Sequence, residues 1–133
     1  LVLQFAWGGD AKNGYLPHNA TPNSAIYAGT HDNDTTAGWY QAAPEQERDH
    51  VRHYLRVDGK DVAWDFVRAS YASASRLAVI TLPDVLSLGS AARFNTPSNA
   101  EGNWQWRYRA AALEKFFDGT TDYLRELAAL YGR

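Results

Sequence analysis

The run Ser24-Ala25-Ile26-Tyr27-Ala28 leads directly into the octet Gly29-Thr30-His31-Asp32-Asn33-Asp34-Thr35-Thr36. A short apolar run that ends in Gly and then in polar residues is typical of a buried parallel strand. Enzymes of the α/β class carry their chemistry at the C-terminal ends of such strands. The octet therefore predicts an α/β fold with functional side chains at this strand end.

The rest of the chain alternates apolar runs with helical patterns. Strands are predicted over residues 1–6, 24–29 and 76–82, and helices over 35–41, 44–58, 60–75 and 118–131. The order strand, helices, strand is the signature of a parallel sheet with a right-handed crossover. Asp34 or Thr35 is expected to cap the first of these helices, and Asp118 or Thr120 the last.

Composition narrows the class of partner. The chain has 13 basic and 15 acidic residues, interspersed, and a net charge of −2, so neither nucleic acid nor an anionic membrane is expected to bind it. No apolar stretch approaches the ~20 residues of a membrane span. The absence of cysteine is compatible with a reducing compartment, and we expect a cytoplasmic protein. Five Trp and eight Tyr favour a neutral substrate held by stacking.

Three blocks, in order along the chain, carry a family resemblance. The first contains LQFAWGGD at 3–10, Asn13 and YLPHN at 15–19; the second is the octet; the third contains DVLSLGS at 84–90, ARFNTP at 92–97 and GNWQWR at 102–107. Together they resemble the 4-alpha-glucanotransferases (amylomaltases or disproportionating enzymes), a branch of the α-amylase superfamily of (β/α)8 barrels. Three ordered blocks are much more specific than one motif.

The resemblance implies a fold and a reaction. A closed (β/α)8 barrel needs about 250 residues, so the 133 residues are expected to form its C-terminal part, about the last three strands with their helices, incomplete on its own and without a second domain. Leu1 lies inside an apolar run and the chain has no Met, which favours the same view. The implied reaction is retaining transfer between α-1,4-glucans such as starch, glycogen or maltodextrin, without metal or organic cofactor.

The resemblance also assigns residues. Retaining transfer uses a carboxylate nucleophile and a carboxyl acid/base, which in this family come from strands four and five, upstream of this chain. The chain alone is therefore expected to be inactive and to need the N-terminal remainder of the barrel. Asp32 matches the family's third carboxylate, which stabilises the transition state through ring hydroxyls of the sugar. His31 matches the histidine that binds the same sugar.

Four further residues are candidates for substrate binding: Phe5, Asp10, Asn95 and Trp104. Phe5 resembles a hydrophobic wall of the groove, Asn95 a residue near the donor sugar, and Asp10 a contact to substrate hydroxyls. Asp10 has an equally good interpretation as a turn residue whose side chain binds its own backbone. Trp104, like Trp39 and Trp106, can stack on a sugar or fill a core.

Other functions fit parts of the sequence. An α-glucan hydrolase of the same superfamily shares the glycosyl-enzyme intermediate, and a non-catalytic maltodextrin-binding module would also explain the aromatic residues. A calcium loop starting at Asp32 fails, because Ala37 and Ala43 stand where Gly and Glu are required. A metal site built on His31-Asp32 lacks histidine partners at ligand spacing, so no metal site is predicted.

Overall fold

The computed structural model describes the backbone of residues 1–133 and all side chains except those of Lys115, Phe116 and Asp118. The strands are β1 (Ala25–Tyr27) and β2 (Leu77–Val79). The α-helices are α1 (Thr36–Ala42), α2 (Glu45–Leu55), α3 (Val62–Ala72), α4 (Leu82–Val85), α5 (Ala110–Lys115) and α6 (Thr121–Tyr131). Short 3-10 helices cover Leu3–Phe5, Pro17–Asn19 and Ser90–Ala92, and a π-helix covers Phe116–Thr120.

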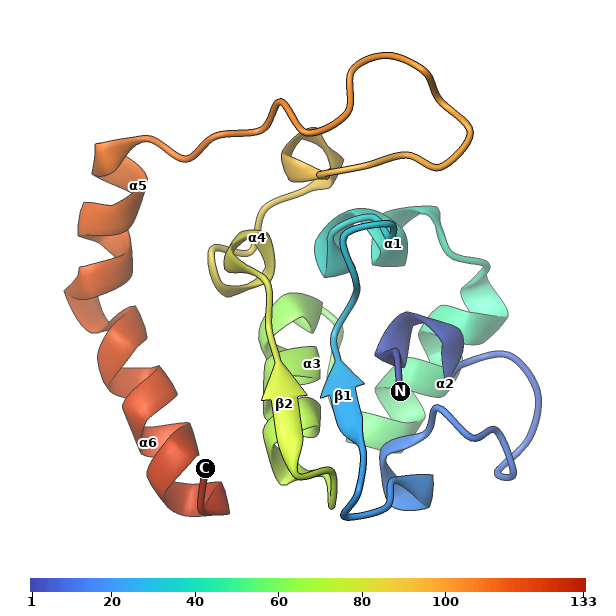
Figure 1. Cartoon of the computed structure of the whole chain (residues 1–133). Coiled ribbons are helices and arrows are strands. Elements are labelled where there is room, and N and C mark those ends of the chain that lie inside the picture. The colour runs from blue at the N-terminus through green and yellow to red at the C-terminus, as the bar shows by residue number, and fades with distance from the viewer.

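The two strands lie side by side and run parallel, with Ile26 opposite Ala78. Figure 1 shows the intervening helices behind this sheet and β2 to the left of β1 while both strands point upward. This is the right-handed crossover that the sequence predicts. The long segment between α4 and α5 crosses the molecule beyond the C-terminal ends of both strands (Figure 1). The α/β class is therefore confirmed.

The predicted strand over residues 1–6 is wrong in extent. Only Val2 pairs with the sheet, in an isolated parallel bridge to Tyr27, and Leu1 exchanges two backbone hydrogen bonds with the same strand. The chain then turns into the 3-10 helix Leu3–Phe5, in which the Phe5 amide donates to Val2. The turn buries Gln4, whose amide donates to the Asp34 carbonyl at 2.8 Å. The side-chain hydrogen bond of Gln4 therefore takes the place of further backbone pairing between this segment and β1.

The predicted strand over 76–82 is also shorter than expected. It ends at Val79, and Thr81 instead caps helix α4 by accepting a hydrogen bond from the Asp84 amide. Pro83 favours this change, because proline fits the first turn of a helix and cannot donate to a strand ladder. The sequence analysis therefore missed α4. It is the element that brings Asp84 back toward the sheet.

The helices that connect the strands follow the sequence more closely. Thr35 caps α1 by accepting from the Gly38 amide at 3.1 Å, so Thr35 rather than Asp34 is the cap. Gly38 allows a close approach there, since a Cβ at this position would lie 2.3 Å from the Ser90 hydroxyl. Helix α2 begins after Pro44 and ends where Arg56 takes a left-handed conformation.

The C-terminal helix is longer and less regular than predicted. It comprises α5, the π-helix and α6, and extends along the side of the molecule next to β2 (Figure 1). Thr120 makes no side-chain cap bond, and the side chain of Asp118 lies outside the described residues. Arg68 on α3 donates to the Tyr123 hydroxyl on α6 at 2.9 Å. Among the described residues, no helix has the length and apolar character needed to cross a membrane.

One continuous core joins the sheet to the helices. Leu3, Trp7, Ile26 and Phe66 are all at most 2% exposed and belong to the same buried cluster. Trp7 lies edge-on to rings of α2 and tilted against Phe66, with ring centroids 5.4 Å apart in the latter pair. Leu77 on the opposite face of β2 is 55% exposed. The helices therefore cover one face of the sheet, and the other face keeps apolar side chains in the open.

Candidate functional site

The octet at residues 29–36 folds as a tight turn directly after β1. The Asn33 side chain accepts hydrogen bonds from the amide and the hydroxyl of Thr30, at 2.9 and 2.7 Å. Gly29 is needed beneath this turn, because a Cβ there would lie 2.5 Å from the Gln4 amide nitrogen. The turn directs the side chains of His31 and Asp32 outward, where they are 58% and 51% exposed.

The Asp32 carboxylate is held by two neighbours. Asn95 donates a 2.6 Å hydrogen bond from Nδ2 to Asp32 Oδ1, although 63 positions separate the two residues. His31 Nε2 lies 3.4 Å from the same oxygen. Among the described residues, no hydrogen bond involves Asp32 Oδ2, and the side chain is 51% exposed, so the protein orients the carboxylate and one oxygen is still available to accept from a ligand hydroxyl.

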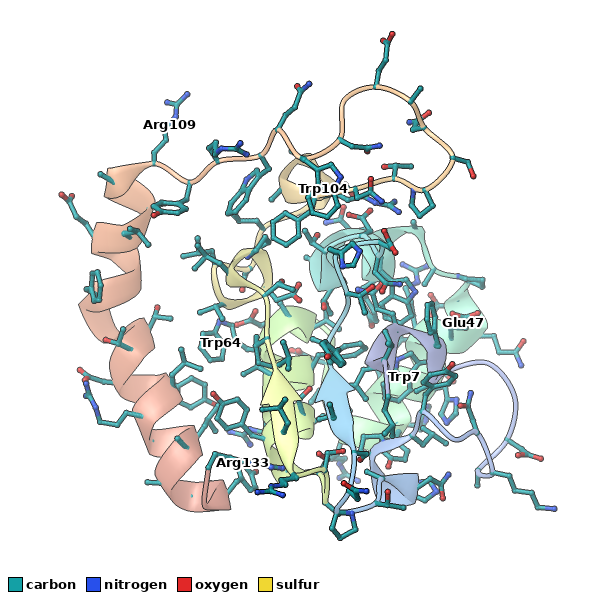
Figure 2. The ribbon with its side chains drawn as sticks, in the orientation of Figure 1. Trp7, Glu47, Trp64, Trp104, Arg109 and Arg133 are labelled. Atoms are coloured by element: carbon teal, nitrogen blue, oxygen red, sulfur yellow. The ribbon has the colours of Figure 1, made fainter. Side chains whose placement is uncertain are left out.

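Trp104 completes the cluster from the long segment after α4. Its indole lies 5.3 Å from the His31 ring, centroid to centroid, at an interplanar angle of 36°. Its backbone is left-handed, with φ 61°, and its amide donates to the Phe94 carbonyl at 2.7 Å. Figure 2 shows Trp104 beyond the strand ends. Trp104 is 56% exposed, so its indole offers an apolar face to solvent beside the His31 ring.

Two side chains that the sequence analysis did not single out join this segment to the octet. Arg93 donates from Nη2 to the Asp32 carbonyl and from Nε to the Asn95 carbonyl, both at 2.8 Å. Ser90 donates to Asp34 Oδ2 at 2.6 Å. Arg93 stands in the quoted block at 92–97, but sequence spacing contains no signal for a contact across 61 positions. Asp34 is accordingly a structural residue here.

The neighbouring strand end carries a carboxylate of a different kind. Asp84 is 1% exposed and accepts from the Thr36 amide at 2.7 Å and from the Thr81 hydroxyl at 3.0 Å. Burial raises the pKa of Asp84, and the hydrogen bond from the Thr36 amide opposes that rise. This carboxylate joins the start of α4 to the start of α1 and has no open side for a ligand.

The structure does not bring every candidate into this cluster. Among the described residues, no hydrogen bond or ring contact joins Phe5 or Asp10 to Asp32, His31, Asn95 or Trp104. Asp10 accepts from the Lys12 amide at 2.8 Å, which is the turn interpretation. Phe5 is 52% exposed and lies edge-on to Tyr15.

The other two tryptophans have structural contacts. Trp39 packs against the core beside Phe66, with ring centroids 5.5 Å apart. Trp106 packs against Phe94 at 5.6 Å. Of these three tryptophans, Trp104 is the one whose ring lies against His31.

The cluster is an open surface with defined chemistry. It combines an oriented carboxylate, an imidazole and an exposed indole, which together can accept hydrogen bonds from a neutral polar ligand and cover an apolar face of it. A hollow of about 530 Å3 lies elsewhere, between α3 and α6, and contains none of the candidate residues. In the part of the chain that the structure describes, no group of three or more metal-ligating side chains occurs.

Comparison with known proteins identifies the family. The family model described as 4-alpha-glucanotransferase matches residues 1–113. The chain belongs to the 4-alpha-glucanotransferase family. The matched range contains all of the cluster described above, from the octet to Trp104.

Curated 4-alpha-glucanotransferases align over almost the whole chain. The chloroplastic/amyloplastic enzyme of Arabidopsis thaliana is 43% identical over 99% of this chain, and the Synechocystis enzyme is 41% identical over 99%. The Thermus thermophilus enzyme is 44% identical over 80%. These alignments cover 23%, 26% and 23% of the relatives, so the chain spans about a quarter of their length.

A solved structure agrees with these relatives. The amylomaltase from Streptococcus agalactiae in complex with acarbose superposes with a TM-score of 0.91 and 28% sequence identity. The superposition covers 99% of this chain and 26% of that one. The two-stranded α/β unit is thus the fold of part of a larger glucanotransferase.

Proposed function

We propose that this chain forms the C-terminal part of the catalytic (β/α)8 barrel of a retaining 4-alpha-glucanotransferase, contributing the last strands and one side of the sugar-binding groove. The observation that carries the proposal is the hydrogen bond between Asn95 and Asp32, with His31 and Trp104 beside it, at the C-terminal ends of parallel strands. Membership of the family supports it, as does the likeness to an amylomaltase solved with acarbose.

Asp32 stabilises the transition state in this proposal. Positive charge develops on the sugar ring as the glycosidic bond breaks, and hydrogen bonds to ring hydroxyls strengthen at the same time. A carboxylate already oriented by Asn95 needs no reorganisation when that charge appears. Its contribution is therefore larger in the transition state than in the bound ground state, and it acts on turnover more than on binding.

His31 and Trp104 bind the sugar next to Asp32. The imidazole offers a nitrogen to a sugar hydroxyl, and the exposed indole covers the C–H face of a pyranose ring. Asn95 binds on the same side through its amide. In this proposal Phe5 and Asp10 line the part of the groove farther from Asp32, since their contacts are with Tyr15 and Lys12 in the segment before β1.

The two carboxyl groups that make and break bonds are provided by other parts of the enzyme. Of the acidic groups near the strand ends, Asp34 and Asp84 are engaged in structural hydrogen bonds. In this proposal the nucleophile and the acid/base lie on earlier barrel strands, and a sugar hydroxyl rather than water resolves the intermediate. The chain needs those strands both for activity and to cover the exposed face of β2.

The test is Asp32→Asn in the full-length enzyme with maltotriose as substrate, followed by chromatography of the products. The wild-type enzyme should release glucose and longer maltodextrins. Loss of the charged acceptor should lower kcat by about 100- to 1,000-fold with a small change in KM. Asp34→Asn is the matched control, because it makes the same change two residues along. Its amide oxygen can still accept from the Thr35 amide, and its NH2 group can donate to the Ser90 hydroxyl, which then accepts instead of donating.

Each outcome decides between functions. Wild-type products that are only shorter than maltotriose would indicate a hydrolase, and binding without turnover would indicate a sugar-binding module. Near wild-type kcat in Asp32→Asn would remove Asp32 from the mechanism. Residues 1–133 alone should give no products, and turnover by them would refute the assignment of the reacting carboxyl groups to other segments.

A further inference from the structure

Arg93 makes a contact that the proposed chemistry does not itself use. Its side chain is half-buried, and one guanidinium donates to two backbone carbonyls: that of Asp32, from Nη2, and that of Asn95, from Nε. These are the two residues whose side chains form the 2.6 Å hydrogen bond at the candidate site. These three hydrogen bonds form a closed cycle that joins Arg93, Asp32 and Asn95, and so connects the turn after β1 to the segment after α4.

The chemistry of this contact requires an arginine. The guanidinium is planar, and its donors are fixed in a fork that can reach two acceptors with defined directions, whereas a lysine ammonium is a point charge on a flexible stem. Charged donors also make stronger hydrogen bonds than neutral ones. The bond to Asp32 joins the segment after α4 to the turn after β1, and the bond to Asn95 holds the guanidinium within its own segment, so Arg93 can fix the position of Asn95 relative to Asp32.

Arg93 does not act as a counter-ion of Asp32. Among the described side chains, the Asp32 carboxylate lies within 4.0 Å of the His31 imidazole and not of the Arg93 guanidinium. Both Arg93 bonds end on carbonyl oxygens. The side chain therefore affects where the carboxylate and the Asn95 amide lie, and leaves the carboxylate free to accept from substrate.

We propose that Arg93 is a positioning residue that holds the Asn95 amide against the Asp32 carboxylate, so that one carboxylate oxygen is fixed and the other faces the sugar. The inference rests on the proposed function, in which Asp32 acts on the transition state. Small displacements of such a group are costly, since a misplacement of about 1 Å can lower a rate by about 100-fold. Arg93 therefore contributes to turnover without touching substrate.

The experiment compares two arginines with the same chemistry in the full-length enzyme. Arg133 also donates to backbone carbonyls, those of Tyr71 at 2.9 Å, Ser73 at 2.6 Å and Ser75, and it joins the end of α6 to the end of α3 and the residues after it. Figure 2 shows Arg133 and Trp104 at opposite ends of the molecule. Arg93→Met and Arg133→Met each remove a guanidinium and keep an unbranched stem, so they lose similar structural bonds at different distances from the site.

Arg93→Met should lower kcat on maltotriose by about 10- to 100-fold, with KM changed by less than about threefold, because uniform binding is preserved. Arg93→Lys should restore little of this loss, since one ammonium does not hold both carbonyls. Arg133→Met should keep kcat within about twofold even where its melting temperature falls, because the loss is structural. Equal kcat losses in the two arginine variants would refute the positioning role.

A double-mutant cycle separates positioning from general damage. If Arg93 acts through Asn95, then Arg93→Met in an Asn95→Ala background should lower kcat by less than about threefold. A full additional 10- to 100-fold loss in that background would also overturn the proposal. Failure of the proposed function would give a different result from failure of the positioning role: the wild-type enzyme itself would then not disproportionate maltotriose.

Discussion

Asp32 and Asp84 follow adjacent parallel strands and have opposite environments. Asp32 comes after β1, is 51% exposed and keeps an oxygen open to solvent. Asp84 comes after β2, is 1% exposed and has both oxygens bonded to the protein. Position at the C-terminal end of a parallel strand therefore does not by itself decide whether a carboxylate is exposed or buried.

The segment that follows each strand produces the difference. After β1 the chain makes an Asn33-supported turn that directs Asp32 away from the sheet. After β2 the chain enters α4, whose first turn directs Asp84 back onto the Thr36 amide at the start of α1. The turn after β1 leaves the Asp32 side chain exposed to solvent, whereas at the start of α4 the Asp84 side chain accepts from the buried Thr36 amide.

The largest effect on stability is expected at Asp84. Asp84→Ala leaves the amide of Thr36, a residue that is 0% exposed, without its acceptor. An unsatisfied buried donor costs about 1–3 kcal/mol, and the lost Thr81 bond adds to it, so unfolding free energy should fall by about 2–3 kcal/mol. Urea unfolding of the full-length enzyme measures the change.

Asp84→Asn is the matched control, because its amide oxygen still accepts from Thr36 and its burial involves no charge. It should lose less than half as much stability as Asp84→Ala. Equal losses in the two variants would mean that the hydrogen bond to the Thr36 amide is not what makes Asp84 stabilising, and the comparison with Asp32 would lose its physical basis.

Much of this arrangement follows from local sequence. The α/β order, the existence of β1 and the octet as a strand-end turn are set by apolar runs, Gly29 and Thr35, whose effects extend over a few residues. The resemblance of three blocks led to the family that the comparisons confirm. His31 and Asp32 were predicted as site residues because the octet that contains them resembles the family's signature, and their roles remain predictions.

The rest depends on contacts between distant segments. The first strand is reduced to one bridge because the buried Gln4 binds the Asp34 carbonyl, and α4 replaces the end of the third. Arg93 reaches Asp32 across 61 positions. Such contacts have no local pattern, so one sequence without a fold does not reveal them, and Phe5 and Asp10 remain predictions that the geometry does not join to the cluster.

Asp65 on α3 is a third carboxylate for this comparison, because it is less exposed than Asp32 and less buried than Asp84. It is half-buried, and burial, followed by repulsion from Asp61, raises its pKa to about 6. A carboxyl whose native pKa lies above its ordinary 3.8 stabilises the fold below pH 3.8 and loses that contribution as pH rises through 6. Asp65→Asn should therefore stabilise the protein at pH 7.5 by about 1 kcal/mol, after allowance for solvent screening.

Thermal unfolding at several pH values checks this sign. The gain from Asp65→Asn should shrink as pH falls from 7.5 to 4.5, because the wild-type carboxyl becomes protonated in the native state. Asp122→Asn is the control, since Asp122 is 75% exposed and pairs with Arg125 on the surface of α6. A gain that is independent of pH would show that desolvation of the charge at Asp65 is not the cause.

The smallest effect on stability is expected at Asp32 itself. Asp32→Ala removes one hydrogen bond, and the released Asn95 amide can bind water because the site is open. Surface changes of this kind stay within about 0.5 kcal/mol, so the urea midpoint should not move while turnover collapses. A loss above about 1 kcal/mol would place Asp32 with Asp84 as a structural residue. An unchanged midpoint, together with the large loss at Asp84, would mean that burial after the strand separates the carboxylate that acts on substrate from the one that holds the fold.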